Sequence, residues 1–425
     1  MATATGVKKA RVGLFRTVDG KNMLATFALV TTLFLLWGFC NGLIDVLNKH
    51  FQTTLHIDKF QSGFVQTANY VAYFLMAIPA GMLARKFGYK GGIITGLSLI
   101  ALGALWFVSA TQIGTYASFL TGLFILAAGL ACLETIANPY TTVLGPAASG
   151  ATRINIAQTF NGVGWVLGPI VGGYFIFGGA NAANANTGLF APYLGIAVVV
   201  LAMLAVFIFA NVPDIQAEEE AKQSDAPRGK PLWRRAHFVL GVAAQFLYVA
   251  AQAGIFGFFI NYVLENVNTT PAEAANWLGI AFAVFTVGRL FGSAAVSLMK
   301  PQIALALYSA INAVLCLAVM LGGSVGLAAL FGTFFFMSIM FPTIFALGIH
   351  GLGDHTKLGS SIIVMSVVGG AIAPPLMGRI ADVTSMRAGF LVPLACFVLV
   401  ALYGAFWSKL EAKDAQGAVP SKQGG

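Results

Sequence analysis

The chain has 425 residues, of which 58% are hydrophobic and 9% are charged, and it contains 49 glycines. This composition excludes an ordinary soluble globular protein, which needs much more polar surface. The net charge of +9 is spread over short connections. We attribute it to orientation in a membrane and expect no nucleic-acid partner.

Apolar runs close to the ~20 residues that a helix needs to cross a bilayer recur along the whole chain. Strands of an outer-membrane barrel would alternate over about ten residues instead. We therefore predict an all-α integral membrane protein, embedded in the lipid bilayer, with twelve transmembrane helices. They are expected at about 23–50, 59–85, 90–110, 115–144, 151–178, 190–211, 236–264, 273–299, 302–321, 325–350, 357–381 and 387–408.

The two halves of the chain repeat a short pattern. Pro139 is followed by Leu144-Gly145, and Pro342 is followed at the same offset by Leu347-Gly348. Such repeats are typical of carriers that move two bundles around a midplane site. We therefore predict two pseudo-symmetric six-helix bundles. The expected divisions are an N-terminal tail 1–22, a first bundle 23–212, a linker 213–235, a second bundle 236–409 and a tail 410–425.

Basic residues predict the orientation. The first tail carries five of them, at Lys8, Lys9, Arg11, Arg16 and Lys21, and the even-numbered connections carry most of the others. By the positive-inside rule, both termini and the linker are expected in the cytoplasm. We expect a multi-pass protein of the bacterial inner membrane that acts as a monomer.

Two acids lie within predicted spans. Asp45 follows Trp37 and Asn41 at i+8 and i+4, so the three share one helix face. Glu134 lies within the fourth span. A carboxylate near the bilayer centre costs about 2.5–3.5 kcal/mol, so we predict that both acids are proton-coupling residues. The alternatives are an ion pair of Asp45 with Lys49, and a buried neutral Glu134 held by a neighbouring amide.

Amide and aromatic side chains on the predicted helices are candidates for sugar binding. Amides both donate and accept hydrogen bonds, which suits hydroxyl groups, and an indole suits the apolar face of a pyranose ring. The alternative is hydrogen bonding between helices. The candidates are Trp37, Asn41, Asn69, Tyr73, Gln158, Asn161, Trp165, Tyr248 and Gln252.

Arg289 is the only basic residue well inside a predicted span. We predict a gating role, in which it bonds carbonyls across the cytoplasmic gate; the alternative is that it snorkels to the membrane surface. The sequence contains no phosphate-binding glycine loop, nucleophile–base pair or cluster of metal ligands. We therefore expect no enzyme activity, no metal and no cofactor, and energy supplied by an ion gradient.

Several segments resemble a known family. They are Ile78-Pro79-Ala80-Gly81, Cys132-Leu133-Glu134-Thr135-Ile136-Ala137-Asn138-Pro139, Ala157-Gln158-Thr159-Phe160-Asn161 and Phe341-Pro342-Thr343-Ile344-Phe345. The chain from Trp37 to about Trp407 is similar to the major facilitator superfamily, specifically to its fucose:proton symporter family of fucose permeases and glucose/galactose carriers. The resemblance implies that Asp45 and Glu134 match two membrane acids linked to protonation and sugar recognition. It also implies that Gln158 lines the cavity.

The predicted function is cation-coupled import of a monosaccharide, a hexose or a 6-deoxyhexose, by alternating access. The coupling ion is expected to be a proton, with sodium as the alternative. A sodium-coupled carrier of sugars or N-acetylhexosamines, a drug/proton antiporter and a sugar-sensing membrane receptor stay open.

Overall fold

The computed structural model describes residues 14–15, 21–146, 149–178, 187–210, 212–213 and 231–416, and nearly all of these are helical. Most of the predicted linker and of both predicted tails lies outside the described residues. The first part of the fold consists of α1 (Leu24–Thr54), α2 (Lys59–Ser62), α3 (Phe64–Ile113), α4 (Tyr116–Val143), α5 (Gly150–Gly172), the π-turn η2 (Gly173–Phe177) and α6 (Thr187–Phe209).

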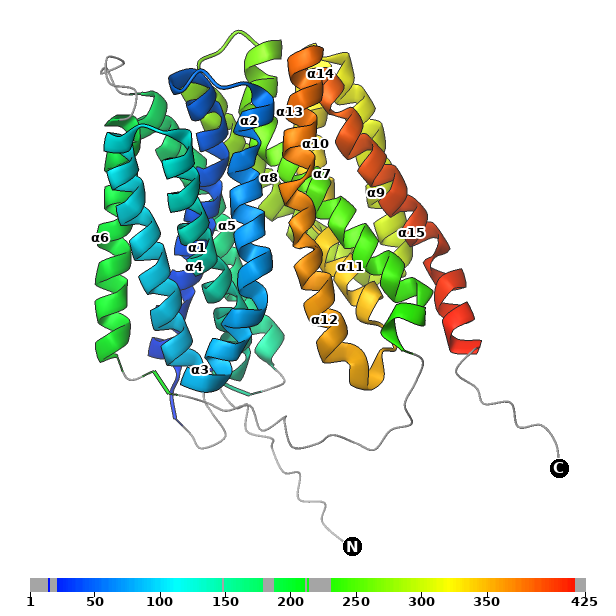
Figure 1. Cartoon of the computed structure of the whole chain (residues 1–425). Coiled ribbons are helices and arrows are strands. Elements are labelled where there is room, and N and C mark those ends of the chain that lie inside the picture. Colours follow the sequence, from blue (N-terminus) through cyan, green and yellow to red (C-terminus); the bar gives the residue numbers. More distant parts are fainter. Residues whose placement is uncertain are drawn as a thin grey trace, which may run out of the picture.

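The second part begins after a short 3₁₀ turn, η4 (Leu232–Arg234). It consists of α7 (Ala236–Asn266), α8 (Pro271–Leu298), α9 (Pro301–Leu321), α10 (Gly323–Met337), α11 (Met340–Ile349), η5 (Gly353–His355), α12 (Thr356–Met365), η6 (Ser366–Ala371), α13 (Ala373–Val383), α14 (Met386–Gly389) and α15 (Leu391–Gln416). Figure 1 shows the two parts as two groups of helices, and α1 begins at the end of the molecule where α15 ends.

The predicted number of spans is confirmed within the described chain. Eleven helical stretches are long and apolar enough to cross a membrane, and the longest runs from Lys59 to Ile113. Gly88 breaks that stretch in two because its backbone adopts φ 68° and ψ −179°. A positive φ is accessible to glycine at little cost, so the chain turns back there and two spans replace one. The described residues thus contain twelve spans.

Two spans of the second part are interrupted. α10 ends at Met337 and α11 starts at Met340, and a 3₁₀ stretch, η6, separates α12 from α13. Such breaks release backbone groups from helical hydrogen bonds, and these groups need partners inside the membrane. The Met337 carbonyl accepts a 2.9 Å hydrogen bond from the Tyr248 hydroxyl of α7. Broken helices of this kind surround the substrate sites of many carriers.

Glycines let α1 and α5 approach closely. A Cβ atom at Gly38 would lie 2.0 Å from the Asn161 carbonyl oxygen, and one at Gly164 would lie 2.3 Å from the Leu35 carbonyl oxygen. Small residues at helix contacts are typical of membrane proteins, because they let two backbones approach closely. Large apolar side chains on the outside stay exposed, for example Phe209 at 87% and Leu321 at 73%, as expected for a surface in contact with lipid.

Candidate functional site

Asp45 is held by an amide of a neighbouring helix. Its side chain lies on α1 and is only 4% exposed. Nε2 of Gln66, on α3, donates a 2.5 Å hydrogen bond to Oδ1 of Asp45. The other oxygen, Oδ2, has no hydrogen-bond partner among the described residues. Among the described residues, Asp45 forms no ion pair with Lys49. The alternative of a local charge pair is therefore not found in the structure.

A hydrogen-bonded cluster lies one to two turns from Asp45 along α1. Nε1 of Trp37 donates a 2.7 Å bond to the Tyr73 hydroxyl of α3. Nδ2 of Asn41 donates to the Trp37 carbonyl at 2.9 Å and to the same hydroxyl at 3.4 Å. Trp37 and Tyr73 are half-buried, while Asn41 is buried. Three residues that the sequence predicts to bind sugar are therefore brought together by hydrogen bonds.

Glu134 and Arg289 belong to different groups of helices and attract each other electrostatically. Glu134 is half-buried on α4, and Arg289 is exposed on α8. The two side chains interact electrostatically although they belong to different groups of helices. The Arg289 guanidinium also lies over the Phe285 ring, 5.1 Å from its centroid. The attraction between Arg289 of the second part and Glu134 of the first depends on the charge of the Glu134 carboxyl group.

Tyr70 links the surroundings of the two acids. This half-buried residue of α3 interacts electrostatically with both Asp45 and Glu134, and also with Tyr248 of the second part. The backbone of η6 packs against its ring, because a Cβ atom at Gly370 would lie 2.5 Å from Tyr70 carbon atoms. Asp45 and Glu134 therefore belong to one polar region between the two groups of helices.

The amides of α5 are engaged with neighbouring helices. Nε2 of Gln158 donates a 3.1 Å bond to Oδ1 of Asn138 on α4. Nδ2 of Asn161 donates a 3.2 Å bond to the Phe34 carbonyl of α1, and the side chain is buried. Gln158 is half-buried and keeps its carbonyl oxygen for another partner. In this conformation Asn161 therefore forms a hydrogen bond between helices, which was the alternative to sugar binding.

Trp165, Tyr248 and Gln252 lie where the two parts of the fold meet. The Trp165 ring of α5 contacts Phe256 of α7 and Phe282 of α8, at centroid distances of 5.9 Å and 4.8 Å. Nε2 of Gln252 donates a 3.0 Å bond to the Tyr248 hydroxyl. Aromatic rings and a hydroxyl–amide pair thus meet where the two parts of the fold pack together, and Phe256, Phe282 and Tyr248 are buried there.

Two buried amides lack hydrogen-bond partners for some of their atoms. Oδ1 of Asn69 on α3, and both Nε2 and Oε1 of Gln245 on α7, have no hydrogen-bond partner among the described residues. Both side chains are almost fully buried. Because an unpaired buried polar atom costs about 1–3 kcal/mol, such atoms are expected to find partners on a ligand or in water.

Two functional features were not predicted from the sequence. Gln66 was not expected to hold Asp45, although it lies on the same face of α3 as Asn69, Tyr70 and Tyr73, which was the available signal. A second set of polar contacts, around Lys59 and Glu265, joins the two groups of helices. No signal in one sequence pairs residues so far apart.

The fold and the site together define a multi-pass membrane transporter built from two helical bundles. Residues 27–366 match the sequence model of the Major Facilitator Superfamily, and the chain belongs to this family. The chain is 39% identical to the L-fucose-proton symporter of Escherichia coli, over 93% of this chain and 97% of that protein. It is 35% identical to a glucose/galactose transporter of Brucella abortus, over 92% and 96%.

A solved structure gives the same result for the fold. The crystal structure of the transporter FucP in the outward conformation matches with a TM-score of 0.66 and 39% identity, covering 90% of this chain and 99% of that chain. The predicted fold class and the predicted family are therefore confirmed.

Proposed function

We propose that the chain is a proton-coupled importer of a monosaccharide. The observation that carries this proposal is the pair of membrane acids, Asp45 and Glu134, in one polar region between two helical bundles. The relatives that match over nearly the whole chain support it, since one carries L-fucose with protons and another carries glucose and galactose.

The two acids couple charge to movement of the bundles. Enclosing an unpaired carboxylate in a low-dielectric site is unfavourable, and protonation removes that charge. A protonated Glu134 also no longer attracts Arg289 across the gap between the bundles. Protonation therefore lowers the cost of closing the bundles around a bound sugar, so the loaded, neutral carrier reorients readily.

The sugar is held by the residues around the acids. Trp37, Tyr73 and Trp165 provide ring surfaces, and Gln158 and Gln252 provide amides at the bundle interface. We also assign Asn69 and Tyr248 to sugar binding; both side chains are buried in this conformation. A pyranose presents an apolar face and several hydroxyl groups, which match this mixture of aromatic and amide surface.

We further propose that both termini are cytoplasmic and that the protein lies in a bacterial inner membrane. The distribution of Lys and Arg supports this orientation. The start of α1 and the end of α15 lie at the same end of the molecule (Figure 1). Under this orientation, the end with α2, α13 and α14 faces outward.

The test is uptake by proteoliposomes of a panel of labelled sugars: L-fucose, D-glucose, D-galactose, D-mannose and N-acetyl-D-glucosamine. Uptake of at least one sugar should rise with an inward proton gradient and should not require sodium. Strict dependence on sodium would identify the sodium-coupled alternative. Binding without counterflow would identify a receptor, and export of lipophilic cations without sugar uptake would identify a drug antiporter.

A further inference from the structure

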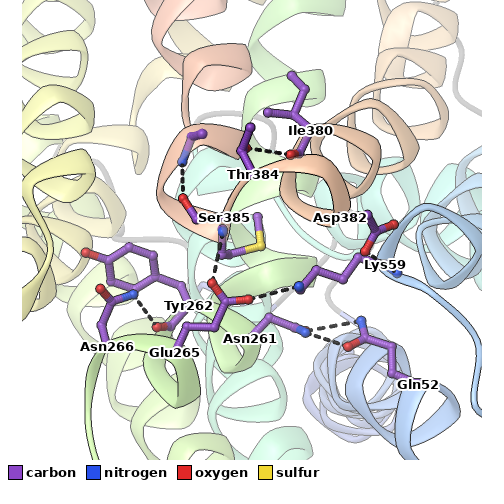
Figure 2. Close-up of polar contacts among 12 residues, drawn as sticks. Gln52, Lys59, Asn261, Tyr262, Glu265, Asn266, Ile380, Asp382, Thr384 and Ser385 are labelled. Carbon is purple, nitrogen blue, oxygen red and sulfur yellow. Dashed lines mark hydrogen bonds and ion pairs between the residues drawn. The ribbon is translucent and has the colours of Figure 1, made fainter.

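Charged and backbone groups join the two bundles at the end of the molecule away from the start of α1. The Asp382 carboxylate of α13 accepts hydrogen bonds from the backbone N–H groups of Lys59 (3.0 Å) and Phe60 (2.8 Å) in α2. Nζ of Lys59 forms a 3.0 Å ion pair with Oε1 of Glu265 on α7. Figure 2 shows these groups side by side. Lys59 is thus held both by its backbone and by its side chain.

A second row of contacts lies deeper along α1 and α7. Nδ2 of Asn261 donates a 2.5 Å bond to Oε1 of Gln52, and Nε2 of Gln52 donates to Ser62 Oγ at 2.8 Å. One turn further from the surface, Nδ2 of Asn48 donates a 2.7 Å bond to the Gly257 carbonyl. Asn48 and Gln52 lie one turn apart, so the contacts follow one face of α1. That face continues to Asp45.

The backbones themselves meet at this end. A Cβ atom at Gly63 would lie 2.6 Å from the Pro375 nitrogen, and one at Gly378 would lie 2.3 Å from the Lys59 carbonyl oxygen. Such contacts leave no room for a sugar to pass between α2 and α13. The crystal structure of the 39%-identical FucP is described as outward, whereas this structure is bridged at the end that the proposed orientation places outside.

Glu265, the partner of Lys59, is also held by contacts within the second bundle. Oε2 of Glu265 accepts a 2.9 Å bond from the Met386 backbone N–H at the start of α14. The neighbouring Asn266 accepts a bond from Nε of Arg387. Glu265 is therefore oriented whether or not Lys59 is present, so the pair can break and reform without rebuilding the second bundle.

The structure assigns the outer gate of the carrier to these residues: Asn48, Gln52, Lys59, Asn261, Glu265 and Asp382. The assignment rests on the proposed function and orientation. The Lys59 and Glu265 side chains are 23% and 33% exposed. A pair exposed to this extent contributes up to about a fivefold change in an equilibrium constant. Individually weak contacts suit a gate that opens in every cycle.

The first test is a reversible crosslink across the gate. The variant Gln52→Cys/Asn261→Cys is oxidised in a background in which the four native cysteines, all buried, are replaced by alanine. Oxidation should form the crosslink and stop uptake, and reduction should restore it. The matched control is Gln302→Cys/Ser408→Cys, because Gln302 bonds Ser408 at 3.1 Å within the second bundle. Its oxidation should leave uptake unchanged.

The second test does not require transport. Ser62→Cys is a small change at a fully buried position of α2, so an impermeant maleimide added outside should label it only when the gate opens. Adding Lys59→Met should raise the labelling rate up to about fivefold, and Asp382→Ala should also raise it. Lys59→Arg, which keeps the charge, should leave it unchanged.

Failure of a crosslink to form, uptake by the crosslinked protein, or equal labelling in Lys59→Met would overturn the gate. If the reduced double-cysteine variant does not transport sugar, the labelling rates of Ser62→Cys alone test the gate. Crosslinking and labelling are read from the mass of the protein, so they report on the gate even if no sugar in the panel is carried. Absence of uptake by the unaltered chain would count against the proposed function alone.

Discussion

Gln66 of α3 donates a 2.5 Å hydrogen bond to Oδ1 of Asp45 on α1, and both side chains are buried. An amide cannot neutralise a carboxylate, but it can orient it and satisfy one of its oxygens. Gln66 therefore fixes which way Asp45 points between the two bundles. The second oxygen has no partner among the described residues and is the atom available for a proton.

Replacing Gln66 should slow coupled transport. In Gln66→Ala, Asp45 loses a hydrogen bond of the kind that contributes about 1.5–3 kcal/mol when one partner is charged. The initial rate of gradient-driven sugar uptake should fall about tenfold or more, since 1.4 kcal/mol corresponds to a factor of ten. The control is Gln112→Ala, at an exposed position near the end of α3, in the span that follows Gly88. Equal uptake by both variants would show that the bond to Asp45 is dispensable.

Gly164 should tolerate no side chain. A Cβ atom there would lie 2.3 Å from the Leu35 carbonyl oxygen and 2.5 Å from the Phe39 nitrogen, both of which belong to the α1 backbone. Gly164→Ala should destabilise the protein by about 1–3 kcal/mol or more, because α1 and α5 must separate. Thermal unfolding in detergent measures this loss.

The matched control for Gly164 is Gly195→Ala in α6, where a Cβ atom would meet nothing within 4 Å. Alanine there should be neutral, or should stabilise the protein by up to about 1 kcal/mol, because it reduces the conformational entropy of the unfolded chain. Equal melting temperatures for the two variants would contradict the tight α1–α5 contact.

The Tyr248 hydroxyl should matter for stability at the broken tenth span. Tyr248→Phe leaves the Met337 carbonyl without its 2.9 Å donor, at the point where α10 ends. Hydrogen bonds inside membrane proteins contribute about 0.6–2 kcal/mol, so the melting temperature should fall measurably. Tyr174→Phe serves as control because Tyr174 is 72% exposed. An unchanged melting temperature for Tyr248→Phe would mean that the carbonyl finds another partner.

Much of the architecture could be predicted from the sequence. Each span is an apolar run of a length set by the bilayer, and charges near the runs limit where they end. The acid at Asp45 was identifiable because a carboxylate at membrane depth is rare without a function. The break at Gly88 falls between the predicted spans 59–85 and 90–110, although the sequence does not reveal the φ angle of this glycine.

The partners of the polar residues could not be predicted. Helical spacing places Asn161 on a face but does not say which helix that face meets, and the structure pairs it with the Phe34 carbonyl. The ion pair between Lys59 and Glu265 joins segments far apart in the chain. Such pairs arise from tertiary packing, and a single sequence does not show which distant residues will come into contact.

The most direct measurement of the central claim is proton movement driven by sugar. Adding the transported sugar outside proteoliposomes at equal internal and external pH should make the medium more alkaline, because each sugar carries a proton inward. Glu411→Gln, at an acid near the end of α15, should behave in the same way. Glu134→Gln and Asp45→Asn should exchange labelled sugar across the membrane without moving protons. Full sugar-driven proton uptake by either variant would contradict the account.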